Sequence, residues 1–191
     1  LDKYVIHHVF KSAGELLNKD NLKHISLNIS SATILNEELF FYILEELHRY
    51  SLSSTSFVIE LTETERIKNL DVFKTITKKY IKEGFKFSLD DYGIGYNSLS
   101  LLNTQCFYEI KIDKSFIDAI NDPKEISIIK SIMQLAKTMD LNVVAEGVER
   151  EDQRDKLLRL GCHFAQGYLF SKAVTLEEAK EYLKINSSRS I

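Results

Sequence analysis

The chain has 191 residues, of which 44% are hydrophobic and 28% are charged, and its formal charge is -3. This length and balance are typical of a globular domain with one sizeable core. The slight acidity argues against a protein that binds nucleic-acid polymers by neutralising their phosphates. No run reaches the roughly 18 apolar residues of a membrane span.

Cysteine usage and the scarcity of proline bear on compartment and domain number. The two cysteines, Cys106 and Cys162, exclude a disulfide framework and suit a reducing cytoplasm. The only proline is Pro123 and there are seven glycines, so no linker divides the chain. We expect one domain over residues 1–185 and a polar tail over residues 186–191. Because the chain opens without Met and directly in a helical pattern, we expect a domain of a longer protein, with any membrane anchor outside this chain.

Strand-like and helix-like segments alternate along the chain. Runs rich in β-branched and aromatic residues predict strands over residues 24–29, 57–61, 85–89, 107–112, 143–145 and 163–166. Helical periodicity covers residues 2–18, 36–50, 69–83 and 175–184, short and long helices around Pro123, and a helix ending at Leu160. The helix ends carry recognisable signals, which are an N-cap at Asn36 and at Thr175, and glycines at the C-terminal positions 84 and 161.

This alternation predicts an α/β fold with a parallel sheet. Successive residues of a strand face opposite ways, so Phe85, Phe87 and Leu89 share one face, while Ser88 and Asp90 share the other. A sheet covered by helices on both faces is apolar on both, so a polar second face favours the interior of a closed barrel. An open doubly wound sheet and an antiparallel sheet with one wet face are the alternatives.

A (β/α)8 barrel needs eight strands and typically about 250 residues, so this chain is about two strands short. We expect the missing strands to precede the first residue. Each predicted strand ends in a residue that can bind metal or phosphate, and these residues are Asn28, Glu60, Asp90 with Asp91, Lys111, Glu146 and Gln166. The carboxyl ends of parallel strands are where α/β enzymes place their chemistry, so we expect these side chains to converge.

The adjacent carboxylates Asp90 and Asp91 are the strongest local signal. Like charges this close disfavour joint ionisation unless cations separate them. A strand-end aspartate can bridge two divalent ions, and two metals about 3.5–4 Å apart hold the attacking and leaving oxygens in phosphoester hydrolysis. The alternative is that one aspartate caps a helix starting near Tyr96.

The other strand ends offer complementary groups. Asn28 and Glu60 carry oxygen ligands suited to magnesium or manganese, although for Asn28 alone a turn role is the more frequent one. Lys111 lies between Ile110 and Ile112, so its buried ammonium requires an anion, either a carboxylate or a substrate phosphate. Glu146 could bind metal or accept a proton from water.

Six segments, in this order along the chain, resemble the EAL family of cyclic di-GMP phosphodiesterases. They are Asn28-Ile-Ser, Glu60-Leu-Thr-Glu, Asp90-Asp-Tyr-Gly-Ile-Gly-Tyr-Asn-Ser-Leu, Lys111-Ile-Asp-Lys-Ser-Phe, Ala145-Glu-Gly-Val-Glu and Gln166-Gly-Tyr-Leu-Phe-Ser. Each segment alone is a weak signal, whereas six in the family's order across nearly the whole chain are highly specific.

The resemblance implies a TIM-like (β/α)8 barrel that hydrolyses one phosphodiester bond of cyclic di-GMP to linear pGpG with two divalent ions, Mg²⁺ or Mn²⁺. One ion would be held by Asn28, Glu60 and Asp90. The second would be held by Asp90, Asp91 and Glu146, and Glu146 would also be catalytic.

Further roles follow from the same resemblance. Lys111 would position the attacking water or steady charge on the phosphate, and Gln166 would form a hydrogen bond near them. Glu63 would hold the loop that contains Gly93, Gly95 and Ser98. Asp113 and Glu149 would support the site nearby.

The chain also departs from the family pattern. The Glu-Ala-Leu signature, whose glutamate would be a metal ligand, is absent. Tyr92 stands where phenylalanine is usual, Ile94 where a small or polar residue is usual, and Ala173 where proline is usual. Ile94 is expected to alter the loop that couples dimerisation to activity.

Three functions stay open from the sequence. The first is the metal-dependent phosphodiesterase, and the second is a catalytically inactive receptor for cyclic di-GMP. The third is another magnesium phosphohydrolase built on an open sheet. The resemblance further implies a homodimer and a preceding sensory or GGDEF-type domain in the full-length protein.

Overall fold

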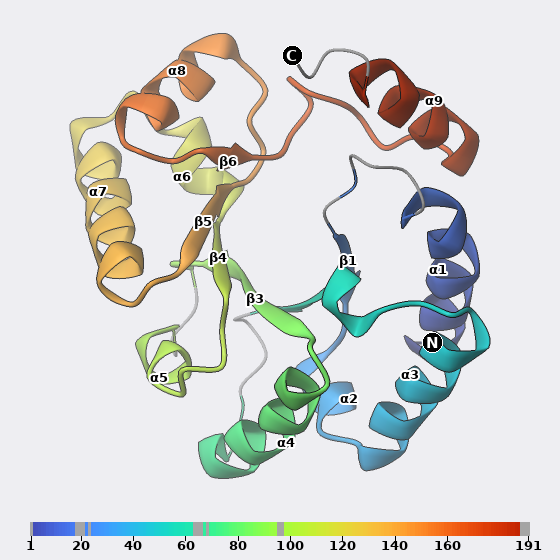
Figure 1. Ribbon diagram of the computed structural model, residues 1–191. Coiled ribbons are helices and arrows are strands. Elements are labelled where there is room, and N and C mark those ends of the chain that lie inside the picture. Colours follow the sequence, from blue (N-terminus) through green and yellow to red (C-terminus); the bar gives the residue numbers. More distant parts are fainter. Residues whose placement is uncertain are drawn as a thin grey trace. The chain divides into compact units, whose positions relative to one another are not determined.

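The computed structural model describes residues 2–17, 22, 24–62, 67, 69–94 and 98–187, without the side chains of residues 98 and 185–187 (Figure 1). The chain divides into two compact units. The first comprises Leu1–Glu60, Ile67–Lys86 and Ala173–Ile191, and the second comprises Leu61–Arg66 and Phe87–Lys172. Among the described residues, no helix is both long and apolar enough to span a membrane.

The first unit contains helices around a parallel strand pair. Its elements are α1 (Asp2–Leu17), β1 (Ile25–Asn28), α2 (Ser31–Ile34), α3 (Glu37–Arg49), a 3-10 turn (Ser54–Ser56), the start of β2 (Phe57–Thr62), α4 (Leu70–Lys82) and α9 (Leu176–Ser187). β1 and β2 run parallel, with Ile25 opposite Phe57 and Asn28 opposite Glu60. The two strands therefore end together.

The core of this unit follows from helical spacing. The buried residues of α1 are Ile6, Phe10 and Ala13, spaced to form one face of the helix. The rings of Phe10 and Phe57 lie 4.6 Å apart between centroids, which joins α1 to β2. On α3 the buried face includes Glu46, whose carboxylate contacts Nδ1 of His7 on α1 at 2.7 Å.

The second unit contains a four-stranded parallel sheet. Its elements are most of β3 (Lys86–Tyr92), α5 (Ser98–Leu102), β4 (Glu109–Ile112), α6 (Lys114–Asp118), α7 (Pro123–Thr138), β5 (Asn142–Ala145), α8 (Glu151–Arg159) and β6 (Phe164–Ala165). The strands pair in chain order, and every pairing is parallel. In Figure 1, α7 and α8 lie on one side of β4, β5 and β6.

Side-chain parity in β3 and β4 agrees with the predicted two-faced pattern. Phe87 and Leu89 are fully buried on one face. The polar face is buried as well, since Ser88 is 0% exposed and Glu109 is 6% exposed. Ser88 Oγ donates to Glu109 Oε1 at 2.9 Å, which satisfies both groups away from water. The parallel pairing and the burial of this face show that the alternative of an antiparallel sheet with one wet face is wrong.

The predicted helix ends are confirmed where their signals are local. The side chain of Asn36 accepts a hydrogen bond from the backbone of Glu38, and Pro123 opens α7. Gly84 adopts a left-handed φ of 102° after α4. The Thr175 hydroxyl accepts from the backbone N–H of Glu178 ahead of α9.

Three elements differ from the prediction. β3 continues to Tyr92, beyond the predicted end at Leu89, so it includes both aspartates. The four-residue helix α2 was not predicted, and it begins where the Ser30 hydroxyl accepts from Thr33 N. α9 runs to Ser187, so the start of the predicted polar tail falls within a helix.

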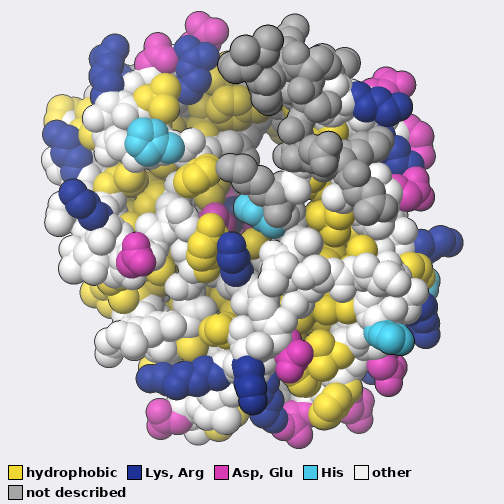
Figure 2. All heavy atoms as spheres, in the orientation of Figure 1, with side chains coloured by type: hydrophobic (Ala, Val, Ile, Leu, Met, Phe, Trp, Pro, Cys, Tyr) yellow, Lys and Arg dark blue, Asp and Glu magenta, His cyan; other side chains and the backbone are white. Residues whose placement is uncertain are grey.

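The surface carries charges of both signs. On the face shown in Figure 2, both basic and acidic side chains are exposed among the described residues. This distribution agrees with the net charge of -3.

Candidate metal centre

The carboxyl end of β3 has an irregular backbone. The ladder between β3 and β4 shifts register between Leu89 and Tyr92, and Asp91 adopts a φ of 55°. Aspartate is among the few non-glycine residues that readily take this left-handed conformation. In a regular strand, adjacent side chains point to opposite faces, whereas a bulge re-aims one of them. The bulge therefore lets Asp90 and Asp91 serve one site. The helix start near Tyr96 lies outside the described residues, so the alternative of a helix cap stays a prediction.

Asp90, Asp91 and Glu146 form a three-carboxylate group that we call the acidic cluster. One carboxylate oxygen of each residue lies within 4.8 Å of the others. Glu146 directly follows the last residue of β5. The cluster therefore combines residues from the carboxyl ends of β3 and β5. Three partly buried carboxylates at this separation repel one another strongly unless positive charge lies among them.

The donor set of the acidic cluster fits a hard divalent cation. All of its ligand atoms are carboxylate oxygens, which magnesium, manganese and calcium prefer. Oδ1 of Asp90 is buried and accepts no well-aligned hydrogen bond, although the ammonium of Lys111 lies 3.1 Å away. A buried carboxylate oxygen with an incomplete set of hydrogen bonds has capacity left for a metal ion.

Lys111 supplies the positive charge next to the acidic cluster. Its side chain is 6% exposed, and Nζ lies 2.7 Å from Oε1 of Glu146. Because the same ammonium also contacts Asp90, the anions that the buried lysine required are carboxylates.

Gln166 is a second side chain that contacts Glu146. Its side-chain Nε2 donates to Oε1 of Glu146. Its backbone N–H donates to the carbonyl of Ala145 at 2.9 Å, and its carbonyl accepts from Val148 N at 3.0 Å. Gln166 and Glu146 are thus held side by side by backbone as well as side-chain bonds.

Asn28 and Glu60 occupy the matching strand ends of the first unit. They lie opposite each other in the ladder, and Ile29 N donates to the carbonyl of Glu60 at 3.1 Å. Glu60 is 6% exposed, whereas Asn28 is exposed. An amide oxygen and a carboxylate therefore lie at paired positions at the ends of these two strands.

The residues expected to support the site have individual local roles. Asp113 is the N-cap of α6, and its carboxylate accepts from Ser115 N at 2.9 Å. Glu149 pairs with Lys114, whose hydrogen bond lowers the pKa of the Glu149 carboxyl below its ordinary value. Gly93 follows β3 with a φ of 105°.

Three of the expected loop residues cannot be placed fully. Glu63 and Gly95 lie outside the described residues. Ser98 is the first residue of α5, and its side chain is likewise outside the described part. Their expected roles stay predictions.

Two residues near the site, Lys114 and Gln153, were not singled out from the sequence. Lys114 contacts Glu149, and the fully buried Gln153 binds the backbone of the segment that follows Glu146. A signal for Gln153 was present, because glutamine at the third position of a helix commonly bonds back to the N-cap backbone.

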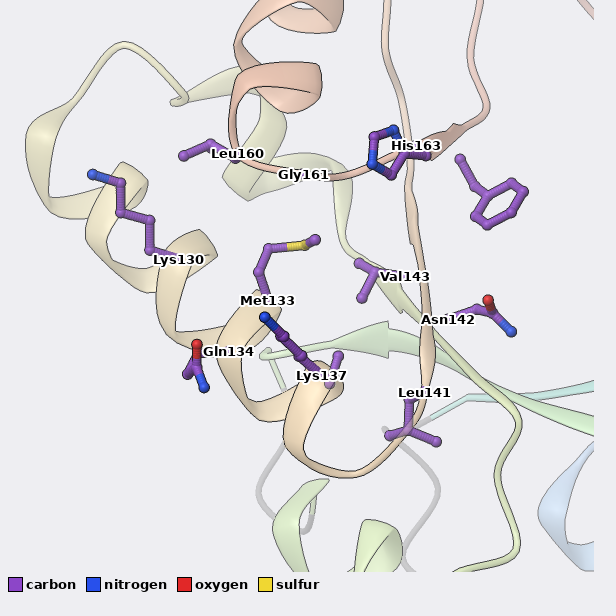
Figure 3. Close-up of a pocket in the computed structure, with 12 residues that line it drawn as sticks. Lys130, Met133, Gln134, Lys137, Leu141, Asn142, Val143, Leu160, Gly161 and His163 are labelled. Carbon is purple, nitrogen blue, oxygen red and sulfur yellow. The ribbon is translucent and has the colours of Figure 1, made fainter.

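A cavity of about 620 Å³ lies elsewhere in the second unit (Figure 3). It is lined by residues of α7, such as Met133 and Lys137, and by residues at the starts of β5 and β6, such as Val143 and His163. The acidic cluster instead lies at the carboxyl ends of these parallel strands. This cavity is therefore not part of the candidate metal centre.

Comparison with known proteins identifies relatives along nearly the whole chain. The family described as EAL domain matches residues 1–173. The probable cyclic di-GMP phosphodiesterase PdeB of Escherichia coli (strain K12) is 34% identical over 174 residues, which cover 91% of this chain and 33% of PdeB. The bifunctional diguanylate cyclase/cyclic di-GMP phosphodiesterase MucR of Pseudomonas aeruginosa is 33% identical over 156 residues, which cover 81% of this chain and 23% of MucR. The chain thus spans a third or less of the length of these relatives.

Solved structures agree with the sequence matches. The PaMucR phosphodiesterase, solved with c-di-GMP, superposes with a TM-score of 0.85 at 30% identity, covering 92% of this chain and 72% of that chain. Klebsiella pneumoniae BlrP1, solved with manganese and cyclic di-GMP, superposes with a TM-score of 0.82 at 28% identity, covering 90% and 44%. The predicted α/β fold of the TIM-like barrel type is confirmed, and the open doubly wound sheet is not supported.

Proposed function

The chain belongs to the EAL domain family, and from this membership we propose that it hydrolyses one phosphodiester bond of cyclic di-GMP to give linear pGpG. The observation that carries the proposal is the acidic cluster with the buried ammonium of Lys111 beside it. The named activity of PdeB and the ligand in the PaMucR structure support the choice of substrate.

We propose two divalent ions, Mg²⁺ or Mn²⁺, as cofactors. Asn28, Glu60 and Asp90 would hold one ion, and Asp90, Asp91 and Glu146 would hold the other. The BlrP1 structure with manganese supports this class of metal. Divalent ions bound by these residues would activate a water molecule and neutralise charge on the phosphate.

The chain's own side chains would orient the reacting groups. The ammonium of Lys111 lies 3.1 Å from Asp90 and 2.7 Å from Glu146, so it is placed to donate to an oxygen of water or phosphate held between them. Gln166 donates to Glu146, which limits the rotation of that carboxylate. We propose Glu146 as the proton acceptor, because its carboxylate lies at a strand end beside the proposed metal ligands Asp90 and Asp91.

We propose that the remaining matched residues shape the substrate side of the site. Glu63 would hold the loop that contains Gly93, Gly95 and Ser98. Asp113 would fix the start of α6, in keeping with its capping bond. We also propose that the full-length protein forms a homodimer and carries a sensory or GGDEF-type domain, for which the bifunctional relative MucR is the support.

The test is hydrolysis by the full-length protein. Cyclic di-GMP is incubated with the protein in separate reactions that contain Mg²⁺, Mn²⁺ or a chelator, and pGpG is quantified by chromatography. We expect turnover with either metal, no turnover with chelator, and none in the matched variant Asp90→Asn.

A catalytically inactive receptor is the second candidate function. It is favoured if the folded protein binds cyclic di-GMP in calorimetry but releases no pGpG with any of the metals. Absence of both binding and turnover in the folded protein contradicts both functions. Light scattering of the same sample measures the proposed dimer.

A further inference from the structure

The short helix α6 contacts both turns that follow the acidic cluster. Gly93 comes two residues after Asp91, and a Cβ placed on it would meet Cε2 of Phe116 at 2.8 Å. Gly147 directly follows Glu146, and a Cβ placed on it would meet Cγ of Lys114 at 2.4 Å. Two side chains of one helix thus pack against the backbone of the two turns that present the carboxylates.

A buried amide joins the second of these turns to α6. Gln153 is 0% exposed, and its Nε2 donates to the carbonyl of Ile117 on α6 at 3.1 Å. Its Oε1 accepts from the backbone N–H groups of Glu149 and Arg150, each at 2.9 Å. One side chain therefore satisfies three backbone groups on two segments that are distant in sequence. Removal of a buried partner leaves such groups unpaired, which is costly.

The opposite side of the same turn is held by the segment after β6. Val148 N donates to the carbonyl of Gln166, and Val148 O accepts from Leu169 N, both at 3.0 Å. Gly167 lies so close that a Cβ on it would meet the Val148 backbone at 2.3 Å. The segment from Glu146 to Arg150 is therefore held between α6 on one side and residues 166–169 on the other.

The ion pair between Lys114 and Glu149 contributes less to this arrangement. Their side chains are 48% and 39% exposed, and solvent screens pairs of that kind. The buried Gln153 is the stronger link because no water competes for its three hydrogen bonds.

From these contacts we infer that Gln153 is a positioning residue for the acidic cluster. It fixes the Glu146–Arg150 segment against α6, and α6, through Phe116, also supports the turn after Asp91. Gln153 thereby sets the spacing between Glu146 and the two aspartates. This inference rests on the proposed function only for the use of the cluster as a metal site, where ligands must be held within about 0.5 Å of the productive geometry.

Two substitutions of Gln153 test the inference in the full-length protein. Gln153→Met keeps the approximate length and removes all three hydrogen bonds. Gln153→Glu keeps the acceptor for Glu149 and Arg150 and removes only the donor to Ile117. Ile129→Ala, in the buried face of α7, is the control for a general loss of stability.

The first readout is Mn²⁺ binding measured by calorimetry without substrate. We expect Gln153→Met to weaken the affinity for Mn²⁺ by about 10- to 100-fold, as other residues that orient metal ligands do. Gln153→Glu should recover part of that loss, and Ile129→Ala should bind Mn²⁺ like the wild type at a comparable fall in melting temperature. If Gln153→Met binds Mn²⁺ as the wild type does, or Ile129→Ala loses as much affinity, the inference is wrong.

The second readout is hydrogen exchange of the metal-free protein. Peptides that contain residues 146–150 and 90–94 should exchange faster in Gln153→Met, whereas peptides of α4 should not change. Equal exchange at residues 146–150 contradicts the inference. Because neither readout requires cyclic di-GMP, failure of the proposed hydrolysis leaves both outcomes interpretable.

Where hydrolysis is observed, steady-state kinetics add a third readout. Gln153→Met should lower kcat and raise the Mn²⁺ concentration for half-maximal rate, with little change in KM for cyclic di-GMP. A residue that served stability alone would leave kcat of the folded fraction unchanged, as expected for Ile129→Ala.

Discussion

The ammonium of Lys111 lies 2.7 Å from a carboxylate oxygen of Glu146, and the lysine side chain is almost fully buried. Lys111 is at the end of β4 and Glu146 follows β5, and the two strands pair in register from Glu109 opposite Asn142. The pairing of β4 with β5 therefore places the lysine beside the acidic cluster. Its positive charge offsets carboxylate repulsion there.

Replacement of Lys111 by Met is expected to separate its two roles. Activity should fall by about 100-fold or more, because a donor aimed at the reacting oxygens is lost. The metal-free variant should also unfold at a lower temperature, and added Mn²⁺ should restore much of that difference by neutralising the carboxylates. The exposed Lys130→Met on α7 is the matched control and should change neither quantity. Full activity in Lys111→Met would exclude a direct role.

The backbone of Asp91 predicts a difference between two variants that both lack its carboxylate. With φ at 55°, glycine tolerates the position, while alanine is strained by about 1–2 kcal/mol. Asp91→Gly and Asp91→Ala should lose Mn²⁺ affinity equally. Asp91→Ala should have the lower free energy of unfolding in urea, and equal stabilities would show that the left-handed conformation is not retained.

Two glycines with left-handed backbones allow a controlled test of close packing. At Gly167 an added Cβ would meet the Val148 backbone at 2.3 Å, whereas at Gly161 nothing lies within 4 Å. Gly161→Ala should cost only the conformational strain of about 1 kcal/mol. Gly167→Ala should cost about 1–3 kcal/mol more, because neither backbone can move freely. Its activity should also fall, since Gln166 is the preceding residue. Equal unfolding free energies of the two variants would contradict this packing.

The free energy of unfolding should depend on pH through the ionisation of the Cys162 thiol. Burial raises the pKa of its thiol above the ordinary value of 9.0. The folded protein therefore keeps the proton at a pH where the unfolded chain releases it. The stabilisation is complete below pH 9.0 and is lost as the pH rises through the folded pKa.

Urea unfolding of the wild type and Cys162→Ala between pH 7 and pH 10 measures the pH-dependent stabilisation by this thiol. The Ala variant should be less stable at neutral pH because of the cavity. Its free energy of unfolding should fall less steeply at alkaline pH than that of the wild type. Parallel curves would indicate that Cys162 ionises equally in the folded and unfolded states.

Much of the fold could be predicted because its signals are local. A side chain such as Asn36 bonds to a backbone group two residues away, and Pro123 restricts its own φ, so each helix start depends on neighbouring residues. Alternation along β3 likewise depends on adjacent residues. The short helix α2 was missed because four residues contain too little periodicity to distinguish a helix from a turn.

The sequence predicts the members of the candidate site but not the contacts between them. The strand-end positions of Asp90, Lys111 and Glu146 follow from the sequence, and so does the requirement of Lys111 for an anion. That its partners are Asp90 and Glu146 depends on the register of three strands, which the sequence alone does not specify. The left-handed backbone of Asp91 likewise depends on the ladder between β3 and β4.

The alternation of strands and helices, the strand-end residues and the resemblance to a family can be read from the sequence, because they depend on neighbouring residues and on their order. The approach of the Asp90, Asp91 and Glu146 carboxylates, and the link that Gln153 forms between their supporting segment and α6, are visible only in the folded chain. Glu146 is more than 50 positions from both aspartates, and Gln153 is 36 positions from Ile117, so these contacts depend on how strands and helices pack rather than on any local preference.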